Sequence, residues 1–382
     1  MCQESGSYQR GIVDFNYIVA VLKEIKEKQV KECVEKKERG TRKVEKPFHI
    51  KVALALKFPK FILNKLSLQR KPESRNFLVV NDDMKRFSLD FLLYCLEKRE
   101  KLHFDLSLFE CEKDRKEILK FVRNKLYLAI FDNVHKNKLF DENDLKYMQK
   151  YKEFFMNKQK KANNYVLKAK NKEYVLPADF RMIDAICGFY HKYGTEILPS
   201  QIKQNLINRD FIDAGAYIGD SALILNELKP NKIYAFEPSK NECDRMQEMM
   251  KLNKNSNVVV VQSGLGSKEG VLNFFGGGMG GFITDKGSEK VKVTTIDSFV
   301  EKNSLNLGLI KMDIEGYELE AIKGAEKTIK EHKPVLIICL YHSGKDFFEI
   351  PNIIKQWDRS YKFRFLNLNH SHPIVDRVLV AY

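Results

Sequence analysis

The 382-residue chain lacks the features that would mark a secreted, disulfide-bonded or membrane-spanning protein. Its seven cysteines are an odd number, and no two form a Cys-x-x-Cys pair, so the sequence encodes neither a zinc ribbon nor a disulfide framework. No apolar run reaches the roughly 18 residues of a transmembrane helix, because residues 52–63 are interrupted by Lys57, Pro59 and Lys60. Residues 1–11 are polar, unlike a signal peptide. We therefore expect reduced thiols, a cytoplasmic location and no membrane span.

Acidic residues are scarce relative to basic ones in only one half of the chain. The 66 Lys and Arg against 51 Asp and Glu give a formal net charge of +15. Residues 1–200 hold 42 basic and 28 acidic residues, whereas residues 201–382 hold 24 and 23. The pattern of apolar residues changes near the same point. We therefore predict a helical, Lys-rich domain over residues 1–178 and a second, separable domain over residues 179–382.

The N-terminal part is predicted to be helical. Residues 14–39 contain no Pro or Gly, and similar apolar spacing recurs over residues 84–100, 115–134 and 141–159. Its lysines suit an anionic partner such as nucleic acid, a phosphorylated glycan or a membrane surface. They are dispersed among glutamates, however, which favours solvated helix faces. Because no zinc-finger spacing or aromatic RNA-binding run is present, a nucleic-acid partner is not expected.

From residue 201 onward, short apolar runs alternate with helical stretches, which is typical of βαβ units. The expected strands cover residues 209–213, 232–236, 257–262, 309–313 and 334–340. Residues 361–368 and 374–381 are expected to close the chain as an antiparallel pair. This pattern predicts an α/β fold with a mostly parallel sheet, preceded by the helical basic domain.

Carboxylates gather where the predicted strands end. Asp213, Glu237, Asp313 and Glu315 each lie at or just after a strand terminus. Open α/β sheets bind their ligands at this edge. Four neighbouring carboxylates are unfavourable unless a cationic ligand, a metal ion or a protein group such as Lys311 neutralises them.

The first strand leads into a glycine-containing loop, Gly215 to Gly219. This loop lacks the second glycine of the G-x-G-x-x-G pattern that receives a pyrophosphate, and Asp213 and Asp220 beside it would repel one. S-Adenosylmethionine carries a sulfonium and an ammonium and no phosphate, so it suits this loop better. Glu237 can accept hydrogen bonds from ribose hydroxyls, a feature shared with NAD enzymes. An NAD-dependent oxidoreductase and a non-catalytic nucleotide-binding module therefore remain alternatives.

Five short motifs occur in a specific order. They are FIDAGAYIGD over 211–220, AFEP over 235–238, TTIDSF over 294–299, IKMDIEGYELE over 310–320 and AIKGA over 321–325. With them, residues 179–382 resemble the FkbM-type family of S-adenosylmethionine-dependent methyltransferases. The resemblance implies a Rossmann-like methyltransferase fold and says nothing about residues 1–178.

The resemblance also implies a cofactor site for S-adenosylmethionine. The predicted contacts are Asp213, Gly215 and Gly219 at the methionine end, Glu237 at the ribose and Ser263, Gly264 and Leu265 at the adenine, with Tyr217 in the first loop. Relatives methylate hydroxyls of diverse metabolites and saccharides. The expected acceptor is therefore a small molecule or glycan, and the expected reaction moves the methyl group to an acceptor oxygen, with nitrogen disfavoured.

An alcohol acceptor loses its proton during attack, so a base beside the methyl group is useful. Asp313 and His342 are the candidate bases, and Glu315 would orient them or help to hold a divalent cation. We favour the version without a metal, because only one histidine is available there. The glycine-rich segment 276–281 is predicted to be a hairpin tip, with a lid over the acceptor as its functional alternative. The sequence does not determine the oligomeric state.

Overall fold

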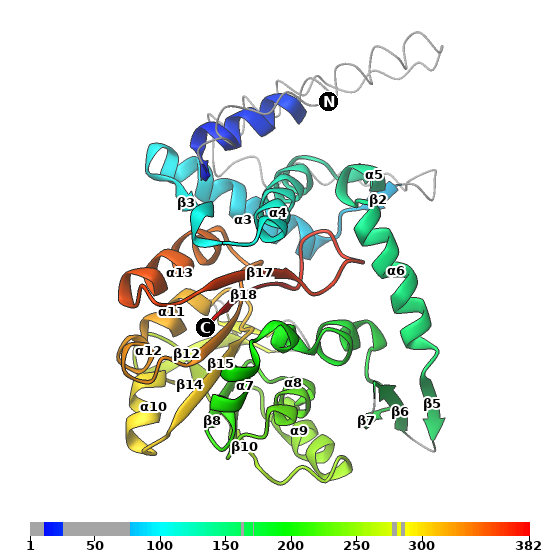
Figure 1. The fold of residues 1–382 in the computed structure, drawn as a ribbon, viewed down its shortest axis with the longest axis vertical. Helices are drawn as coiled ribbons and strands as arrows, with labels where there is room; N and C mark the ends of the chain where they lie inside the picture. The colour runs from blue at the N-terminus through cyan, green and yellow to red at the C-terminus, as the bar shows by residue number, and fades with distance from the viewer. Residues whose placement is uncertain (1–10, 26–76, 162–163, 171, 277–280, 284–286) are drawn as a thin grey trace.

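A seven-stranded sheet forms the centre of the fold (Figure 1). The computed structural model describes residues 11–25, 77–161, 164–170, 172–276, 281–283 and 287–382. The strand order is β10 (Val258–Val261), β9 (Ile233–Phe236), β8 (Asp210–Ala214), β15 (Leu307–Met312), β16 (Val335–Cys339), β18 (Arg377–Ala381) and β17 (Phe363–Asn367). The first five strands are parallel, and β18 is antiparallel to both of its neighbours. The predicted α/β fold and its closing antiparallel pair are confirmed.

The order of the strands creates a crevice at one edge of the sheet. From β8 the chain moves outward to β9 and β10, and then returns to the other side of β8 to form β15 and β16. Strands β8, β15 and β16 are buried along their whole length, which explains why β15 and β16 are nearly continuous apolar runs. A ligand site is expected between the carboxyl ends of β8 and β15, where the direction of winding reverses.

Helices cover both faces of the sheet (Figure 1). Helices α8 and α9 lie to its right in that view and α10 to α13 to its left. The bounds are α7 (Ser200–Leu206), α8 (Asp220–Leu225), α9 (Lys240–Leu252), α10 (Ile296–Lys302), α11 (Glu318–Lys323), α12 (Glu326–His332) and α13 (Gly344–Trp357). A smaller sheet combines β11 (Gly264–Leu265), β14 (Glu289–Thr294), β12 (Gly270–Phe275) and β13 (Phe282–Ile283). The central part of the predicted glycine-rich tip, residues 277–280, lies outside the described residues.

Three of the predicted N-terminal helices are present, as α3 (Asp82–Lys98), α4 (Glu112–Ile130) and α6 (Glu142–Phe155), with the short α5 (Lys136–Leu139) between them. The helix predicted over 14–39 is described only as far as residue 25. Two short strand pairs join β1 (Ile12–Asp14) to β3 (His103–Asp105) and β2 (Phe77–Val79) to β4 (Asn133–His135). No helix in the described part of the chain is long and apolar enough to span a membrane, and residues 52–63 lie outside that part.

The expectation of a wholly helical N-terminal part is wrong for residues 158–177. They form a three-stranded antiparallel sheet, β5 (Lys158–Lys161), β6 (Asn164–Ala169) and β7 (Lys172–Pro177). Buried residues alternate with exposed or half-buried ones along β6 and β7. The buried residues are Leu167 and Ala169 on β6 and Tyr174 and Leu176 on β7. This two-residue period is typical of a strand with one buried face, and the many lysines obscured it.

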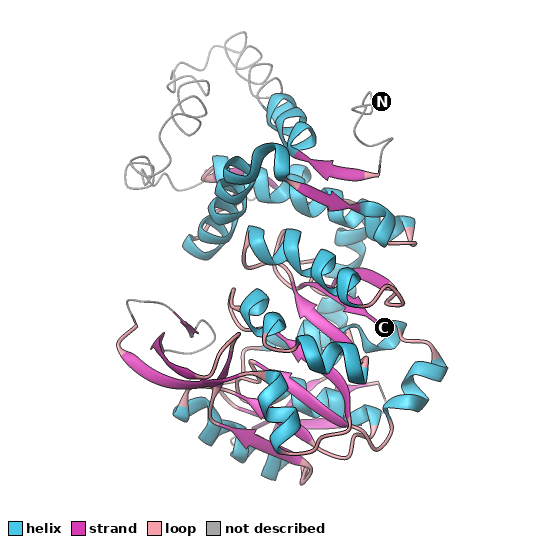
Figure 2. Ribbon diagram, turned by 90° about the vertical axis from the view of Figure 1, so that its left-hand side faces the viewer, coloured by secondary structure: helices cyan, strands magenta, loops and turns pink. Residues whose placement is uncertain are grey.

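The N-terminal helices pack directly on the α/β part and share its core (Figure 2). The ring of Phe104 stacks on Phe347 of α13, with 4.4 Å between centroids. Asp114 of α4 accepts a 2.6 Å hydrogen bond from Arg364 of β17. Residues on both sides of position 178 therefore belong to one continuous hydrophobic core. This packing argues against the predicted separability of residues 1–178.

Candidate functional site

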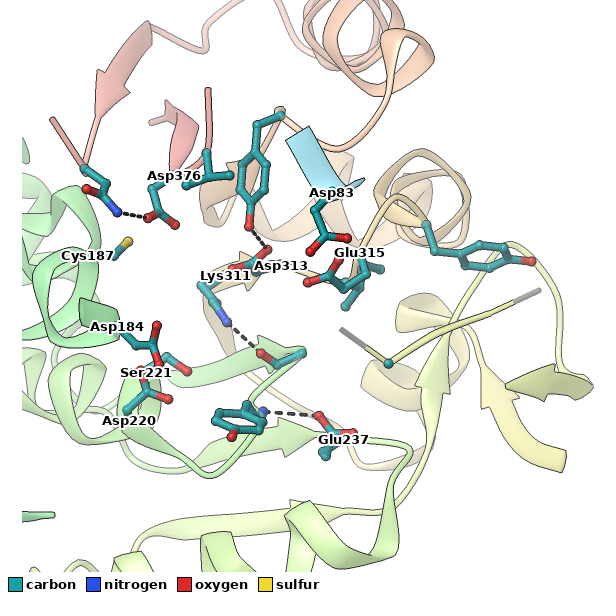
Figure 3. A pocket seen from close by; sticks show the side chains of 18 of the residues that line it. Asp83, Asp184, Cys187, Asp220, Ser221, Glu237, Lys311, Asp313, Glu315 and Asp376 are labelled. Carbon is teal, nitrogen blue, oxygen red and sulfur yellow. Dashed lines mark hydrogen bonds between the residues drawn. The ribbon is translucent and has the colours of Figure 1, made fainter. Parts of the chain in front are cut away.

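A pocket of about 580 Å³ lies at the carboxyl ends of the central strands (Figure 3). Seven of the predicted site residues line it: Gly215, Tyr217, Glu237, Gly264, Leu265, Asp313 and Glu315. Four others, Asp213, Gly219, Ser263 and His342, are not among the lining residues. Most of the residues predicted from the sequence therefore line this pocket. The other four are not among its lining residues.

The loop after β8 comes too close to the next strand to carry side chains at its glycines. Gly215 has φ +72°, and a Cβ there would lie 1.8 Å from the carbonyl oxygen of Asp313. Gly219 has φ +89°, and its Cβ would lie 2.7 Å from the side chains of Met246 and Met250 on α9. At Gly215 the backbone of Asp313 leaves no room for a Cβ, and at Gly219 the left-handed backbone would be strained with any side chain. The loop therefore presents bare backbone to the pocket at Gly215.

Asp213 has a partner within the protein. Lys311 Nζ lies 3.1 Å from Asp213 Oδ1 and donates a 2.8 Å hydrogen bond to the carbonyl oxygen of Gly215. The hydroxyl of Ser221 donates a 2.6 Å hydrogen bond to Asp213 Oδ2. Burial alone would lower the pKa of Lys311, but Asp213 and Asp313 outweigh it and raise that pKa. The neutralising cation is thus Lys311, and Asp213 shapes the loop from behind.

Glu237 ends β9 and faces the pocket from the side opposite Glu315 (Figure 3). Its Oε1 accepts a 2.9 Å hydrogen bond from the amide of Ser239, and its Oε2 accepts a 3.2 Å hydrogen bond from the amide of Tyr217. Burial raises the pKa of Glu237 to about 7. Since each carboxylate oxygen can accept more than one hydrogen bond, both keep capacity for hydroxyl donors.

His342, predicted as a candidate base, is buried behind the pocket lining. It is only 3% exposed, and its Nδ1 lies 2.9 Å from Glu318 Oε1. Its Nε2 lies 3.5 Å from Asp313 Oδ1 and 3.7 Å from Glu315 Oε2. Burial alone would lower the pKa of His342, but Glu318 and Glu315 outweigh it and raise that pKa to about 10. An imidazolium cannot accept a proton, and His342 is not among the lining residues of the pocket. We therefore expect His342 to position the neighbouring carboxylates.

Of the three predicted catalytic residues, Glu315 and Asp313 line the pocket. Burial raises the pKa of Glu315 to about 7, whereas the nearby His342 opposes that rise. Asp313 Oδ1 accepts a 3.3 Å hydrogen bond from the hydroxyl of Tyr341. A carboxylate with a pKa near the working pH, in a pocket and within reach of a ligand, has the properties of a general base.

The same cluster offers atoms that could ligate a metal ion. One ligand atom each from Asp313, Glu318 and His342 lie within 4.8 Å of one another. A metal ion at this position would have to displace the proton on His342. The positive charge of the protonated imidazole already offsets the negative charge of the neighbouring carboxylates. We therefore retain the metal-free version as our expectation.

The comparison with known proteins decides the family of this region. Residues 213–365 match the family described as the methyltransferase FkbM domain. This region is an FkbM methyltransferase domain. A hexuronic acid methyltransferase, AglP of Haloferax volcanii, is 28% identical over 167 residues, which cover 42% of this chain and 68% of that protein.

Solved structures of methyltransferases are also similar to this chain. FkbM from Methylobacillus flagellatus KT matches with 17% identity and a TM-score of 0.45, over 78% of this chain and 62% of that one. The match therefore spans less than two thirds of that relative's length. A Streptococcus mutans putative methyltransferase, crystallised with SAH, matches with 15% identity and a TM-score of 0.32, over 50% of this chain and 94% of that one.

The pocket of the FkbM domain is completed by residues that precede the domain. Helix α3 and the residue before it contribute Asn81, Asp83, Met84, Arg86 and Phe87 to the lining. Arg86 Nη2 lies 4.0 Å from Glu315 Oε2. No motif in the sequence marks this wall, because α3 reaches the pocket through tertiary packing.

Two contacts fix α3 on the FkbM domain. Asp90 accepts a 2.8 Å hydrogen bond from the amide of Gly344, at the start of α13. Lys125 of α4 donates from its buried Nζ to the carbonyl oxygens of Tyr341 and Phe87. These contacts tie the N-terminal helices to residues on both sides of His342, Tyr341 and Gly344.

Proposed function

We propose that this protein uses S-adenosylmethionine to methylate a hydroxyl oxygen of a saccharide or related metabolite. The supporting observation is that a glycine loop, a hydroxyl-binding carboxylate and a carboxylate with a pKa near 7 converge on one pocket of an FkbM methyltransferase domain. The five described cysteines are free, which suits the reducing cytoplasm that we propose as the protein's location.

The residues present fit the cofactor. Bare backbone at Gly215 allows close approach, Glu237 can accept hydrogen bonds from ribose hydroxyls, and Gly264 and Leu265 line the pocket beyond it. S-Adenosylmethionine supplies a methyl group that its sulfonium has already activated. A dinucleotide fits less well because the loop lacks the glycine pattern that receives a pyrophosphate and is flanked by the buried Asp213 and Asp220.

The chain's own residues then position the acceptor and receive its proton. Glu315 is proposed to take the proton of the attacking hydroxyl, and Asp313 to orient that hydroxyl. His342, charged and behind both carboxylates, holds them at the pocket surface. Positioning supplies much of the rate in such a reaction.

A saccharide acceptor is supported by the acidic lining and by the named activity of the relative. Asp83, Asp313, Glu315 and Asp376 line one pocket, and carboxylates accept hydrogen bonds from several sugar hydroxyls at once. The test is to incubate the protein with methyl-labelled S-adenosylmethionine and a panel of neutral and uronic-acid oligosaccharides. Label that survives mild alkali is a methyl ether at a hydroxyl, as we expect. Label released as methanol is an ester at a carboxylate, which would contradict hydroxyl methylation.

Glu237→Ala is expected to weaken binding of S-adenosylhomocysteine about tenfold or more. The variant loses hydrogen bonds to the ribose, and hydrogen bonds to a charged group contribute roughly 1.5–3 kcal/mol each. Calorimetric titration measures the effect, and an unchanged melting temperature without ligand would show that the fold is intact. Equal affinity in both proteins would contradict the ribose assignment.

The rate of methyl transfer at saturating cofactor and acceptor is expected to rise with pH and to reach half its maximum near pH 7. Burial raises the pKa of Glu315 to about 7, and only its ionised form can accept a proton. Activity is therefore lost as the pH falls below that value. A rate that stays constant from pH 5.5 to 8.5, or falls as the pH rises, would contradict the assignment of Glu315 as the base.

A further inference from the structure

One outer surface of the molecule is strongly basic and remote in sequence from the FkbM motifs. Helix α6 and the sheet β5–β6–β7 carry nine lysines between residues 145 and 172. Over the whole of these elements, residues 142–177, four acidic residues accompany them, Glu142, Asp144, Glu153 and Glu173. The nine are Lys146, Lys150, Lys152, Lys158, Lys160, Lys161, Lys168, Lys170 and Lys172. We call them the lysine surface. Figure 1 shows α6 and β5 following one another along the right-hand edge of the molecule.

Most of this charge is not balanced by neighbouring carboxylates. Lys170 pairs with Glu196. Within the described part of the chain, no carboxylate lies at ion-pair distance from Lys152, Lys160 or Lys161, and all three are exposed. Like charges held close together repel one another, so an anionic partner would relieve this repulsion. Over residues 142–177, nine lysines stand against four acidic residues, so the balance of charge is more basic here than over the whole of residues 1–200.

Two apolar side chains project from the same basic surface. Leu145 is 58% exposed and Met156 is 83% exposed. They are 11 residues apart on or just after α6, close to three full turns, so they share one face with Lys152 between them. Basic residues interspersed with exposed apolar side chains are typical of helices that bind the surface of an anionic bilayer.

Nucleic acid is a poorer fit to this surface. The segment from 145 to 172 contains no arginine, the residue favoured for bidentate contacts to phosphates and base edges. The ring of Tyr165, the aromatic residue of β6, is covered by Lys158, whose Nζ lies 4.2 Å from the ring centroid. The ring is also partly buried against the core, so it is poorly placed for a base to stack on.

We propose that the lysine surface docks this protein on an anionic membrane surface, with lysines contacting lipid headgroups and Met156 and Leu145 entering the interface. Strand β5 is the edge strand of its sheet, which leaves Lys160 and Lys161 accessible to a flat surface. The interaction is peripheral and is independent of the proposed methyl transfer.

Flotation of the full chain with lipid vesicles tests the proposal. The protein is expected to float with phosphatidylserine-rich vesicles but not with phosphatidylcholine vesicles, and to detach as salt is raised. The triple variant Lys152→Glu, Lys160→Glu, Lys161→Glu is expected to bind about a hundredfold more weakly, at roughly fivefold for each lysine near the surface. Met156→Ser alone should weaken binding by a smaller factor.

A charge-matched control separates local docking from the overall positive charge. The variant Lys302→Glu, Lys327→Glu, Lys330→Glu changes exposed lysines on α10 and α12 by the same total charge and should bind like the unmodified protein. Equal loss in both triple variants, or absence of binding to anionic vesicles, would overturn the proposal. Binding of an RNA oligonucleotide that depends on the lysine surface, without binding to vesicles, would overturn it as well. Thermal melts confirm that the variants are folded.

Discussion

Glu315→Gln is expected to reduce the rate of methyl transfer by about a hundredfold to ten-thousandfold, the range that a general base contributes. Glutamine keeps the size and hydrogen-bonding shape of the side chain but cannot accept a proton. Affinity for S-adenosylhomocysteine should change little, because Glu315 lies across the pocket from Glu237 (Figure 3). Initial rates with labelled cofactor, together with calorimetry, separate the two effects.

Glu320→Gln is a matched control on the same segment. Glu320 pairs with Lys323 and Ser267 and is not among the lining residues of the pocket. The Glu320→Gln variant should leave the rate of methyl transfer unchanged. His342→Gln should also lower turnover and displace the pH profile, because it removes the positive charge beside Glu315. Full activity of Glu315→Gln would show that the acceptor proton leaves by another route.

A chain that begins at Asp179 is expected to be insoluble or molten. Truncation removes Phe104 and the other N-terminal aromatic residues that cover Phe347 of α13. Each such ring buries about 150–250 Å². It also removes Glu117, the partner of Arg377, whose side chain is almost fully buried. An unpaired buried charge is strongly destabilising.

Size-exclusion chromatography and a thermal melt of the truncated chain measure this effect. As a control, residues 1–178 can be supplied as a separate chain during expression, which should restore solubility if the missing contacts are the cause. A monomeric truncated protein that melts cooperatively and binds cofactor with full affinity would instead support the separable domains that the charge pattern predicts.

The sequence predicted the parts of the site that local chemistry determines. Gly215 and Gly219 are required by a tight turn, and Glu237, Asp313 and Glu315 follow strand ends, so their positions were expected from the strand pattern alone. All but Gly219 line the pocket. The same logic identified Lys311 as a candidate neutralising group, which the structure places beside Asp213.

The remaining features depend on packing between distant segments. The pKa of His342 is set by Glu318 and by its burial, and neither effect is evident from its place after a strand. Helix α3 is held at the pocket by contacts between distant segments, which include Asp90 with Gly344 and the ring of Phe91 against Phe347 and Phe348 of α13. The three-stranded sheet was missed because an abundance of lysine concealed its alternating pattern.

The most direct test of the account is calorimetric titration of S-adenosylhomocysteine and of NAD into the full chain and into Gly215→Val. We expect one site for S-adenosylhomocysteine per chain and no binding of NAD. In Gly215→Val we expect loss of the S-adenosylhomocysteine site, because the added Cβ would lie 1.8 Å from the carbonyl oxygen of Asp313 and the loop could not keep its shape. Binding of NAD, or S-adenosylhomocysteine binding that Gly215→Val leaves unchanged, would contradict the assignment of this pocket.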